Sequence, residues 1–248
     1  SESNSVSKLG QIIEETDALV AISAITPDKG RDIKTFMRNL SMIENLSEFL
    51  AGSPCAHVVY ISSDAVYDDD SHPVREESCC SPASFHGLMH LARERMLAAT
   101  LQEAGTPLMI LRPSLLYGAA DTHNGYGPNR FMRQAGEGSA ISLFGNGEEK
   151  RDHVYISDLS SLIRLCLENK SEGTLNVATG SSVSFADVAR YAVDLQGNDS
   201  NVECNPRSNP ITHRHFDTTE TIKAFPSFAF TALEDGLAQI ARSGRNND

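Results

Sequence analysis

One short segment limits the folds open to this chain more than any other. The apolar run His57–Ile61 ends in two hydroxyl side chains, Ser62 and Ser63. The β-branched and other apolar residues of this run face both sides, which predicts a strand buried on both faces, as in a parallel sheet. In open α/β sheets, functional groups gather at the carboxyl ends of such strands. The sequence therefore predicts a parallel sheet with a candidate site at Ser62 and Ser63.

Strand and helix patterns alternate around this run. Strands are predicted at 17–24 and 107–112, and helices at 31–51 and 82–104. The first helix has apolar residues at helical spacing, which is typical of a helix that covers a sheet. Such alternation implies right-handed β-α-β crossovers. The fold class predicted is α/β, with a doubly wound, Rossmann-like parallel sheet.

The later part of the sequence has weaker patterns. Two capping patterns, Ser184-x-x-Asp187 and Thr231-x-x-Glu234, predict the starts of two helices. The segment 118–147 is rich in Gly, Asn and Asp, which predicts a long functional loop region.

Composition excludes some classes of partner. The chain has 248 residues, 40% of them hydrophobic, and a net charge of -12. This acidic balance argues against a nucleic-acid surface, because phosphate contacts need clustered Lys and Arg. No apolar run approaches the roughly 18 residues of a membrane span, and the amino terminus has no leader-like pattern. Five cysteines without C-x-x-C spacing favour reduced thiols. We expect a soluble, cytoplasmic protein that binds neither nucleic acid nor membrane.

A second motif, Ser84-Phe85-His86-Gly87 continuing to Glu94, follows the hydroxyl pair. Together the two motifs resemble the extended short-chain dehydrogenase/reductase family, the NAD-dependent nucleotide-sugar epimerases, dehydratases and reductases. That family has a strand, S-S-x-x-V-Y-G, and then S-x-Y-G-x-x-K-x-x-x-E on a helix. Four further segments are similar to the family's, in order and spacing, at 111–118, 127–131, 141–147 and 151–158. The resemblance covers residues 17 to 240 and implies a smaller C-terminal substrate-binding lobe.

The resemblance also identifies a missing motif. The family binds NAD or NADP with a G-x-x-G-x-x-G turn in its first β-α-β unit, and this sequence contains no such turn. Either the sequence is a fragment of a longer chain, or the chain has lost its dinucleotide site. We therefore expect an N-terminally incomplete Rossmann-like core at 1–117. The rest, 118–248, is expected to mix core strands with the substrate-binding lobe, without a clean boundary.

The predicted catalytic residues are Ser63, His86 and His90. By resemblance, Ser63 falls on the family's catalytic Ser/Thr, while His86 and His90 fall on its Tyr and Lys. An imidazole with a pKa near 6.5 needs no neighbouring cation to exchange protons at neutral pH. His86 would then serve a sugar hydroxyl or ketone that Ser63 also binds, and His90 would bind ribose or orient His86.

Three alternatives to this catalytic assignment stay open. Both histidines are ordinary helix residues in a protein that has lost its redox chemistry, or they form a metal site, for which no third ligand is evident. A register shift of one residue would place Phe85 and Met89 on the Tyr and Lys instead and remove both titratable groups.

The resemblance predicts two sets of binding residues, one for the cofactor and one for the substrate. The cofactor positions, for NAD or NADP, are Ser23, Ala24, Asn39, Ser62, Pro113 and Ser114. The substrate positions are Asn129 as an amide contact, Phe144 against the base, and Arg151 and Arg207 at the diphosphate. Arginine suits this role because its planar fork pairs with two phosphate oxygens. The alternatives to a binding role are that Phe144 lies in the core, that Arg151 pairs with a nearby Asp, and that Arg207 lies in a solvated turn.

The function predicted is an NAD(P)-dependent epimerase, dehydratase or reductase that acts on a nucleotide-diphosphate sugar or a similar small molecule. The alternative is a catalytically degenerate relative that acts as a nucleotide-binding or regulatory subunit. The helices at 31–51 and 82–104 have more apolar residues than one sheet face would bury, so a homodimer through these helices is expected.

Overall fold

The computed structural model describes residues 12–70, 72–121, 124–197, 200–208 and 210–245. The chain divides into two units, each made of separate stretches. The first comprises the described residues within Ser1–Ser71 together with Glu76–Pro113 and Ser161–Asn176. The second comprises His72–Arg75, Ser114–Ser160 and the described residues within Val177–Asp248.

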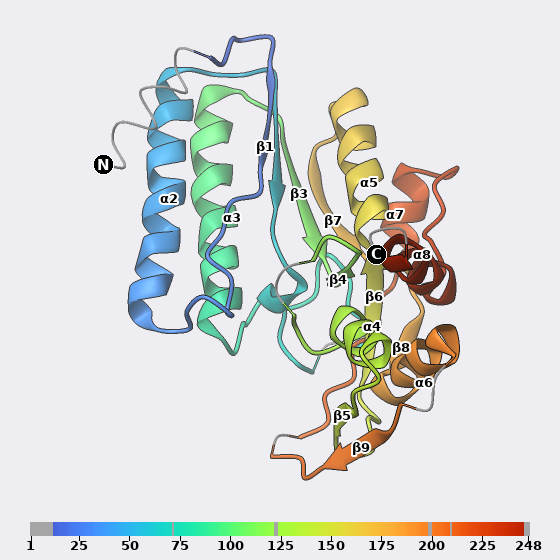
Figure 1. Ribbon diagram of the computed structural model, residues 1–248. Coiled ribbons are helices and arrows are strands. Elements are labelled where there is room, and N and C mark those ends of the chain that lie inside the picture. The colour runs from blue at the N-terminus through green and yellow to red at the C-terminus, as the bar shows by residue number, and fades with distance from the viewer. Residues whose placement is uncertain (1–11, 71, 122–123, 198–199, 209, 246–248) are drawn as a thin grey trace. The chain divides into compact units, whose positions relative to one another are not determined.

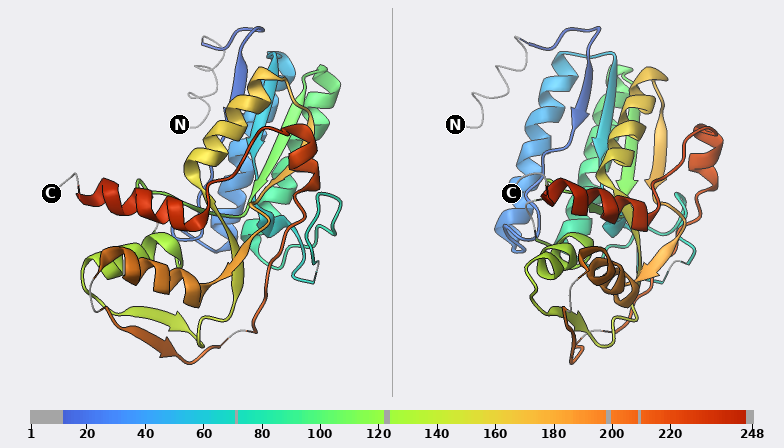
Figure 2. Two further views of the ribbon diagram at one scale, coloured as in Figure 1. Left: turned by 90° about the vertical axis from the view of Figure 1, so that its right-hand side faces the viewer. Right: turned by 45° about the vertical axis from the view of Figure 1, so that its right-hand side comes forward.

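The first unit is built on a four-stranded sheet in the order β1-β2-β3-β7. β1 pairs parallel with β2, and β2 with β3. Figure 1 shows α2 and α3 side by side on one face of this sheet, and Figure 2 places the second half of α5 on the other face. The predicted α/β fold with a doubly wound parallel sheet is confirmed. Its elements are β1 (Ala18–Ala21), α2 (Ile33–Gly52), β2 (His57–Ile61), the 3-10 helix η1 (Asp64–Val66), α3 (Phe85–Ala104), β3 (Leu108–Pro113), α5 (Ile156–Glu168) and β7 (Gly173–Val177).

Local sequence explains where the two long helices begin. The side chain of Asp32 accepts a hydrogen bond from the backbone N–H of Thr35 and caps α2. Ser84 Oγ accepts from the N–H of Gly87, 3.1 Å away, and caps α3. Such caps satisfy backbone donors that the first helical turn leaves open. Both helices therefore start two to three residues later than the apolar pattern predicts, at Ile33 and Phe85.

The second unit has two small sheets. One has the order β4-β6-β8, with β4 and β6 parallel and β6 and β8 antiparallel. The other is the parallel pair β5-β9. The elements are β4 (Leu115–Tyr117), α4 (Pro128–Gly136), β5 (Ile141–Phe144), β6 (Lys150–Tyr155), β8 (Ser182–Ser184), α6 (Phe185–Gln196), β9 (Val202–Asn205), α7 (Thr219–Ala224) and α8 (Leu233–Arg245).

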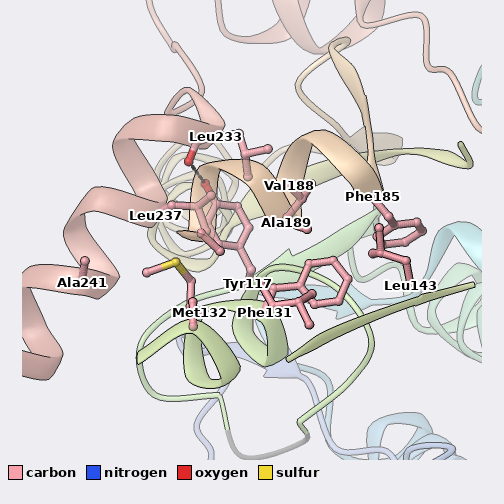
Figure 3. Packing of buried hydrophobic residues seen from close by; sticks show 13 residues of the cluster. Tyr117, Phe131, Met132, Leu143, Phe185, Val188, Ala189, Leu233, Leu237 and Ala241 are labelled. Carbon is pink, nitrogen blue, oxygen red and sulfur yellow. Dashed lines mark hydrogen bonds between the residues drawn. The ribbon is translucent and has the colours of Figure 1, made fainter. Parts of the chain in front are cut away.

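The core of the second unit lies between α4, α6 and α8 (Figure 3). Tyr117 is buried at its centre, and its hydroxyl donates to the carbonyl oxygen of Leu233. Phe131 and Phe185 pack edge to face, with ring centroids 6.3 Å apart. Burial of aromatic rings of this size supplies much of the driving force for a small unit.

One expectation for this unit is wrong. The segment 118–147 is not one long loop, because it contains α4 and β5. The Thr231 pattern is followed by a helix as predicted, since α8 begins at Leu233, and the Thr231 hydroxyl donates to Asp158 Oδ1. The Ser184 pattern is confirmed, with Ser184 Oγ accepting from the N–H of Asp187.

Candidate active site

The hydroxyl pair lies in the turn between β2 and η1. Ser63 caps η1, with its Oγ accepting from the N–H of Ala65 at 3.1 Å, and it stays half-buried. Ser62 is buried, and its Oγ donates to Glu94 Oε1 at 2.5 Å. Of the two predicted serines, Ser63 is therefore the one whose side chain is not held by a buried carboxylate.

A buried polar network fixes this turn from below. Arg112 pairs with Glu94 through two bonds, 2.9 Å and 2.7 Å long, and both side chains are almost fully shielded from water. Arg112 also donates to the hydroxyl of Tyr67, which in turn donates to Asn176. Burial raises the pKa of Tyr67 to about 12, so this phenol stays protonated. Paired and fully bonded, the Arg112 and Glu94 charges hold Ser62 in one orientation.

Gly87 brings helix α3 against the serine turn. A Cβ built at Gly87 would collide with the carbonyl oxygen of Ala65 in η1. Only glycine permits this approach of backbone to backbone. The residue before it, His86, is therefore held at the end of α3 that packs on the turn carrying Ser63.

The two histidines have different surroundings. His86 is half-buried and lines a cavity of about 500 Å³ together with Ser84, Phe85 and Asn39. Burial lowers the pKa of His86 below its usual 6.5, so its imidazole is neutral at pH 7. His90 is buried and does not line this cavity, and its Nδ1 lies 2.8 Å from the hydroxyl of Tyr60. Burial, His86 and Arg93 hold the pKa of His90 well below 6.5.

The predicted cofactor positions are mostly bonded within the protein. Asn39 accepts from the N–H of Ile25 and donates to its carbonyl oxygen, which ties the loop after β1 to α2. Ser114 is buried, and its Oγ donates to the carbonyl oxygen of Asp152. Ser23 lies exposed in that loop, where its carbonyl oxygen accepts from Arg93 at 2.7 Å. The remaining positions are a half-buried Ala24 beside Ser23 and a buried Pro113 at the end of β3.

A second cavity, of about 410 Å³, lies in the second unit and is lined by three predicted substrate residues, Phe144, Arg151 and Arg207. The β5-β9 pairing aligns Phe144 with Asn205, two residues before Arg207. Phe144 is 48% exposed, and its ring centroid lies 5.0 Å from that of Tyr126, so part of this aromatic residue is accessible to a ligand. Leu115 also lines this cavity.

The fourth substrate position lies elsewhere. Asn129 is buried at the start of α4, and its Oδ1 accepts from the N–H of Gly118 at 3.1 Å. It does not line the cavity that holds the two arginines.

Two further residues beside cavities, Glu149 and His153, carry no pattern in the sequence that marks them as site residues. Glu149 lines the arginine cavity and forms ion pairs with Arg151 and Arg207. His153 is buried on β6 beside a cavity of about 470 Å³, and neither of its ring nitrogens has a hydrogen-bond partner among the described residues. Burial lowers the pKa of His153 to about 3. In the sequence, the strand pattern around His153 indicates an ordinary core position. The charged run around Glu149 indicates a solvated surface.

Comparison with known proteins identifies the family. A model of the NAD dependent epimerase/dehydratase family matches residues 3–178. The chain belongs to this family. The predicted resemblance to the NAD-dependent epimerases and dehydratases is thereby confirmed.

Individual members of the epimerase/dehydratase family are distant in sequence. The chain is 23% identical over 236 residues to the uncharacterized UDP-glucose epimerase YtcB of Bacillus subtilis, which covers 92% of this chain and 74% of the relative. It is 28% identical over 165 residues to dTDP-L-rhamnose 4-epimerase of Burkholderia thailandensis, covering 64% of this chain and 46% of the relative.

Solved structures of similar proteins share the fold. UDP-N-acetylglucosamine 4-epimerase from Bacillus cereus superposes with a TM-score of 0.83 and 24% identity, over 99% of this chain and 83% of that one. MoeE5, solved with UDP-glucuronic acid and NAD, gives a TM-score of 0.87 and 23% identity, over 100% and 85%. The Rossmann-like fold is therefore shared with the epimerase/dehydratase family.

The family is NAD-dependent, but this sequence supplies no glycine-rich turn for the pyrophosphate of a dinucleotide. At the predicted cofactor positions, Asn39, Ser62 and Ser114 direct their side chains to protein partners. In the part of the chain that the structure describes, no cluster of His, Cys, Asp or Glu could hold a metal ion, and no helix is long and apolar enough to cross a membrane.

Proposed function

We propose that this chain carries the substrate-binding and proton-transfer residues of an NAD- or NADP-dependent enzyme that modifies a nucleotide-diphosphate sugar. The observation that carries this proposal is the cavity of the second unit, where Arg151 and Arg207 lie near the half-exposed ring of Phe144. Two guanidinium groups suit a diphosphate, and a partly exposed aromatic residue suits a nucleotide base. Names of relatives in the family, such as UDP-glucose epimerase, support the same substrate class.

His86 is the proposed proton-transfer residue. A neutral imidazole that lines a cavity accepts a proton from a sugar hydroxyl, and the protonated form returns it in a later step. The half-buried hydroxyl of Ser63 is the proposed hydrogen-bond partner of the same sugar oxygen. His90, neutral and bonded to Tyr60, acts as a positioning residue through its edge-to-face contact with His86, 4.7 Å between ring centroids.

The substrate half of the proposal is tested by binding. We expect UDP-glucose to raise the melting temperature of the wild-type chain, since a ligand that binds only the folded state stabilises it. Replacing one arginine, Arg151→Ala or Arg207→Ala, should weaken binding roughly tenfold or more, as expected for loss of a charged hydrogen bond. Arg164→Ala is the control, because Arg164 is an exposed residue of α5 paired with Glu168. An equal shift for all four proteins would place the ligand elsewhere.

The catalytic half is tested by turnover with NAD or NADP and a panel of UDP- and dTDP-sugars. We expect His86→Phe to lower kcat by about 10² to 10⁴ and to leave sugar-nucleotide binding unchanged. Activity should rise with pH through the His86 pKa, which burial places below 6.5. If wild-type protein binds UDP-glucose but turns over no sugar and binds neither dinucleotide, the degenerate nucleotide-binding relative is the better description.

A further inference from the structure

Glu149 places a carboxylate between the two arginines of the proposed diphosphate cavity. Its Oε1 lies 2.6 Å from Arg151 Nη2, and its Oε2 lies 2.7 Å from Arg207 Nη1. The three side chains are only 15% to 19% exposed. Charges this well shielded interact more strongly than an ordinary surface pair. Glu149 therefore holds donors of both guanidinium groups at once.

The remaining contacts show how these arginines are held. Arg151 donates to the carbonyl oxygen and to the hydroxyl of Thr212, which keeps its guanidinium at the cavity wall. Arg207 donates to the carbonyl oxygen of Pro210, while its buried Nε has no hydrogen-bond partner among the described residues. At Arg151 Nη2 and Arg207 Nη1, which face Glu149, a phosphate would compete with the carboxylate.

The backbone of Glu149 is held by a hydrogen bond, so a ligand that displaces Glu149 from the arginines has to move its side chain. Its carbonyl oxygen accepts from the N–H of Phe185 at the start of α6. Next to it, the carboxylate of Glu148 accepts from Asn146 and interacts with Arg207 at longer range, but within the described part of the chain it forms no ion pair with either arginine. Glu149 is therefore distinguished from its acidic neighbour by contact.

We propose that Glu149 is an internal competitor of the ligand, which sets how tightly and how selectively this cavity binds phosphates. This inference rests on the proposed function. The carboxylate occupies the positions of phosphate oxygens, and a ligand must displace it and then lie beside its negative charge. A nucleoside diphosphate has two phosphate groups to pair with the two guanidinium groups, so it gains more attraction to offset this repulsion than a nucleoside monophosphate, which has one. Removing the charge of Glu149 should tighten binding and reduce that discrimination.

The test is calorimetric titration of the whole chain with UDP and with UMP. In Glu149→Gln the side chain keeps its size and loses its charge, so we expect UDP to bind about tenfold tighter than to the wild type, and UMP to gain more than UDP. Glu148→Gln removes the same charge without breaking an ion pair to an arginine and should change the Kd less than about threefold. Glu149→Asp, too short to bridge both arginines, should fall between, and it replaces Glu149→Gln if that variant fails to fold.

Each remaining result overturns a specific statement. If wild type binds UDP through Arg151 and Glu149→Gln binds it equally or more weakly, the competitor role is wrong and the substrate site stands. An equal gain in Glu148→Gln would make the effect one of general charge and overturn the role of contact. If no variant binds UDP, the proposed diphosphate site fails, and the inference fails with it.

Discussion

At the scale of single residues, the shifted pKa values of Asp152 and His153 change the stability of the chain with pH in opposite directions. Burial raises the pKa of Asp152 to about 6, although Thr179 donates two hydrogen bonds to its carboxylate. Burial lowers the pKa of His153 to about 3. Between these limits the folded chain favours a protonated Asp152 and a neutral His153, while the unfolded chain prefers the reverse in the range around pH 4 to 6.

These shifts predict how stability changes with pH. Because unfolded His153 takes up a proton below pH 6.5, its contribution falls by about 1.4 kcal/mol for each pH unit of acidification. Asp152 acts in the opposite sense. The stability that its raised pKa contributes is fully present below about pH 4 and is lost as the pH rises to about 6. We expect His153→Phe to lose less stability than wild type between pH 6.5 and 4 in urea unfolding. Asp152→Asn should lose more, and parallel curves for all three proteins would contradict both assignments.

A site residue is predictable from the sequence when it falls on a position that the family resemblance identifies. Phe144, Arg151 and Arg207 were placed by their resemblance to family segments, and they line one cavity. Glu149 was not predicted, because an acidic residue within a charged run gives no sequence pattern for burial. Its role depends on the loop after β9, which brings Arg207 to Glu149, and no local pattern encodes this contact.

At the scale of elements, the close approach of α3 to η1 depends on Gly87. Alanine favours helix over glycine by about 1 kcal/mol, but its Cβ would collide with the Ala65 carbonyl oxygen. We expect Gly87→Ala to destabilise the chain by about 1 to 3 kcal/mol, as overpacking does. Gly52→Ala, at the end of α2 where a Cβ meets nothing within 4 Å, is the matched control. Urea unfolding of both variants measures the difference, and equal midpoints would show that η1 yields without cost.

The strands and α-helices from β1 to β3 are predicted from local patterns, whereas α4 and α5 are not. α2, α3 and β2 follow from apolar periodicity and β-branched runs, which act locally. α4 begins at Pro128 after Gly127, a pair typical of turns, so 118–147 was expected to be a loop. Its helical state comes from packing, because Phe131, Met132 and Ala135 are buried in the core of the second unit. Tertiary burial of this kind outweighs local propensity.

At the scale of the whole molecule, the predicted homodimer has candidate contact residues. α2 exposes Ile33 and Met37, which are 66% and 54% accessible, and α3 exposes Phe85 and Leu88. Exposed apolar side chains on neighbouring helices favour burial against a second copy. We expect a dimeric mass by light scattering at micromolar concentration and a monomeric mass for the double variant Met37→Glu, Leu88→Glu. The control is Ile222→Glu, which changes an equally exposed residue of α7, and a monomeric wild type would contradict the prediction.

The first unit is drawn from three stretches of chain, and the last of them, Ser161–Asn176, follows a long excursion through the second unit. Only when this last stretch is present can the hydroxyl of Tyr67 donate to Asn176 and β7 pair with β3 in the sheet. During translation the ribosome must therefore release residue 176 before this sheet is complete. Until that moment the nascent chain presents β3 as an open edge, which is the interval when chaperone protection against strand pairing with other chains matters most.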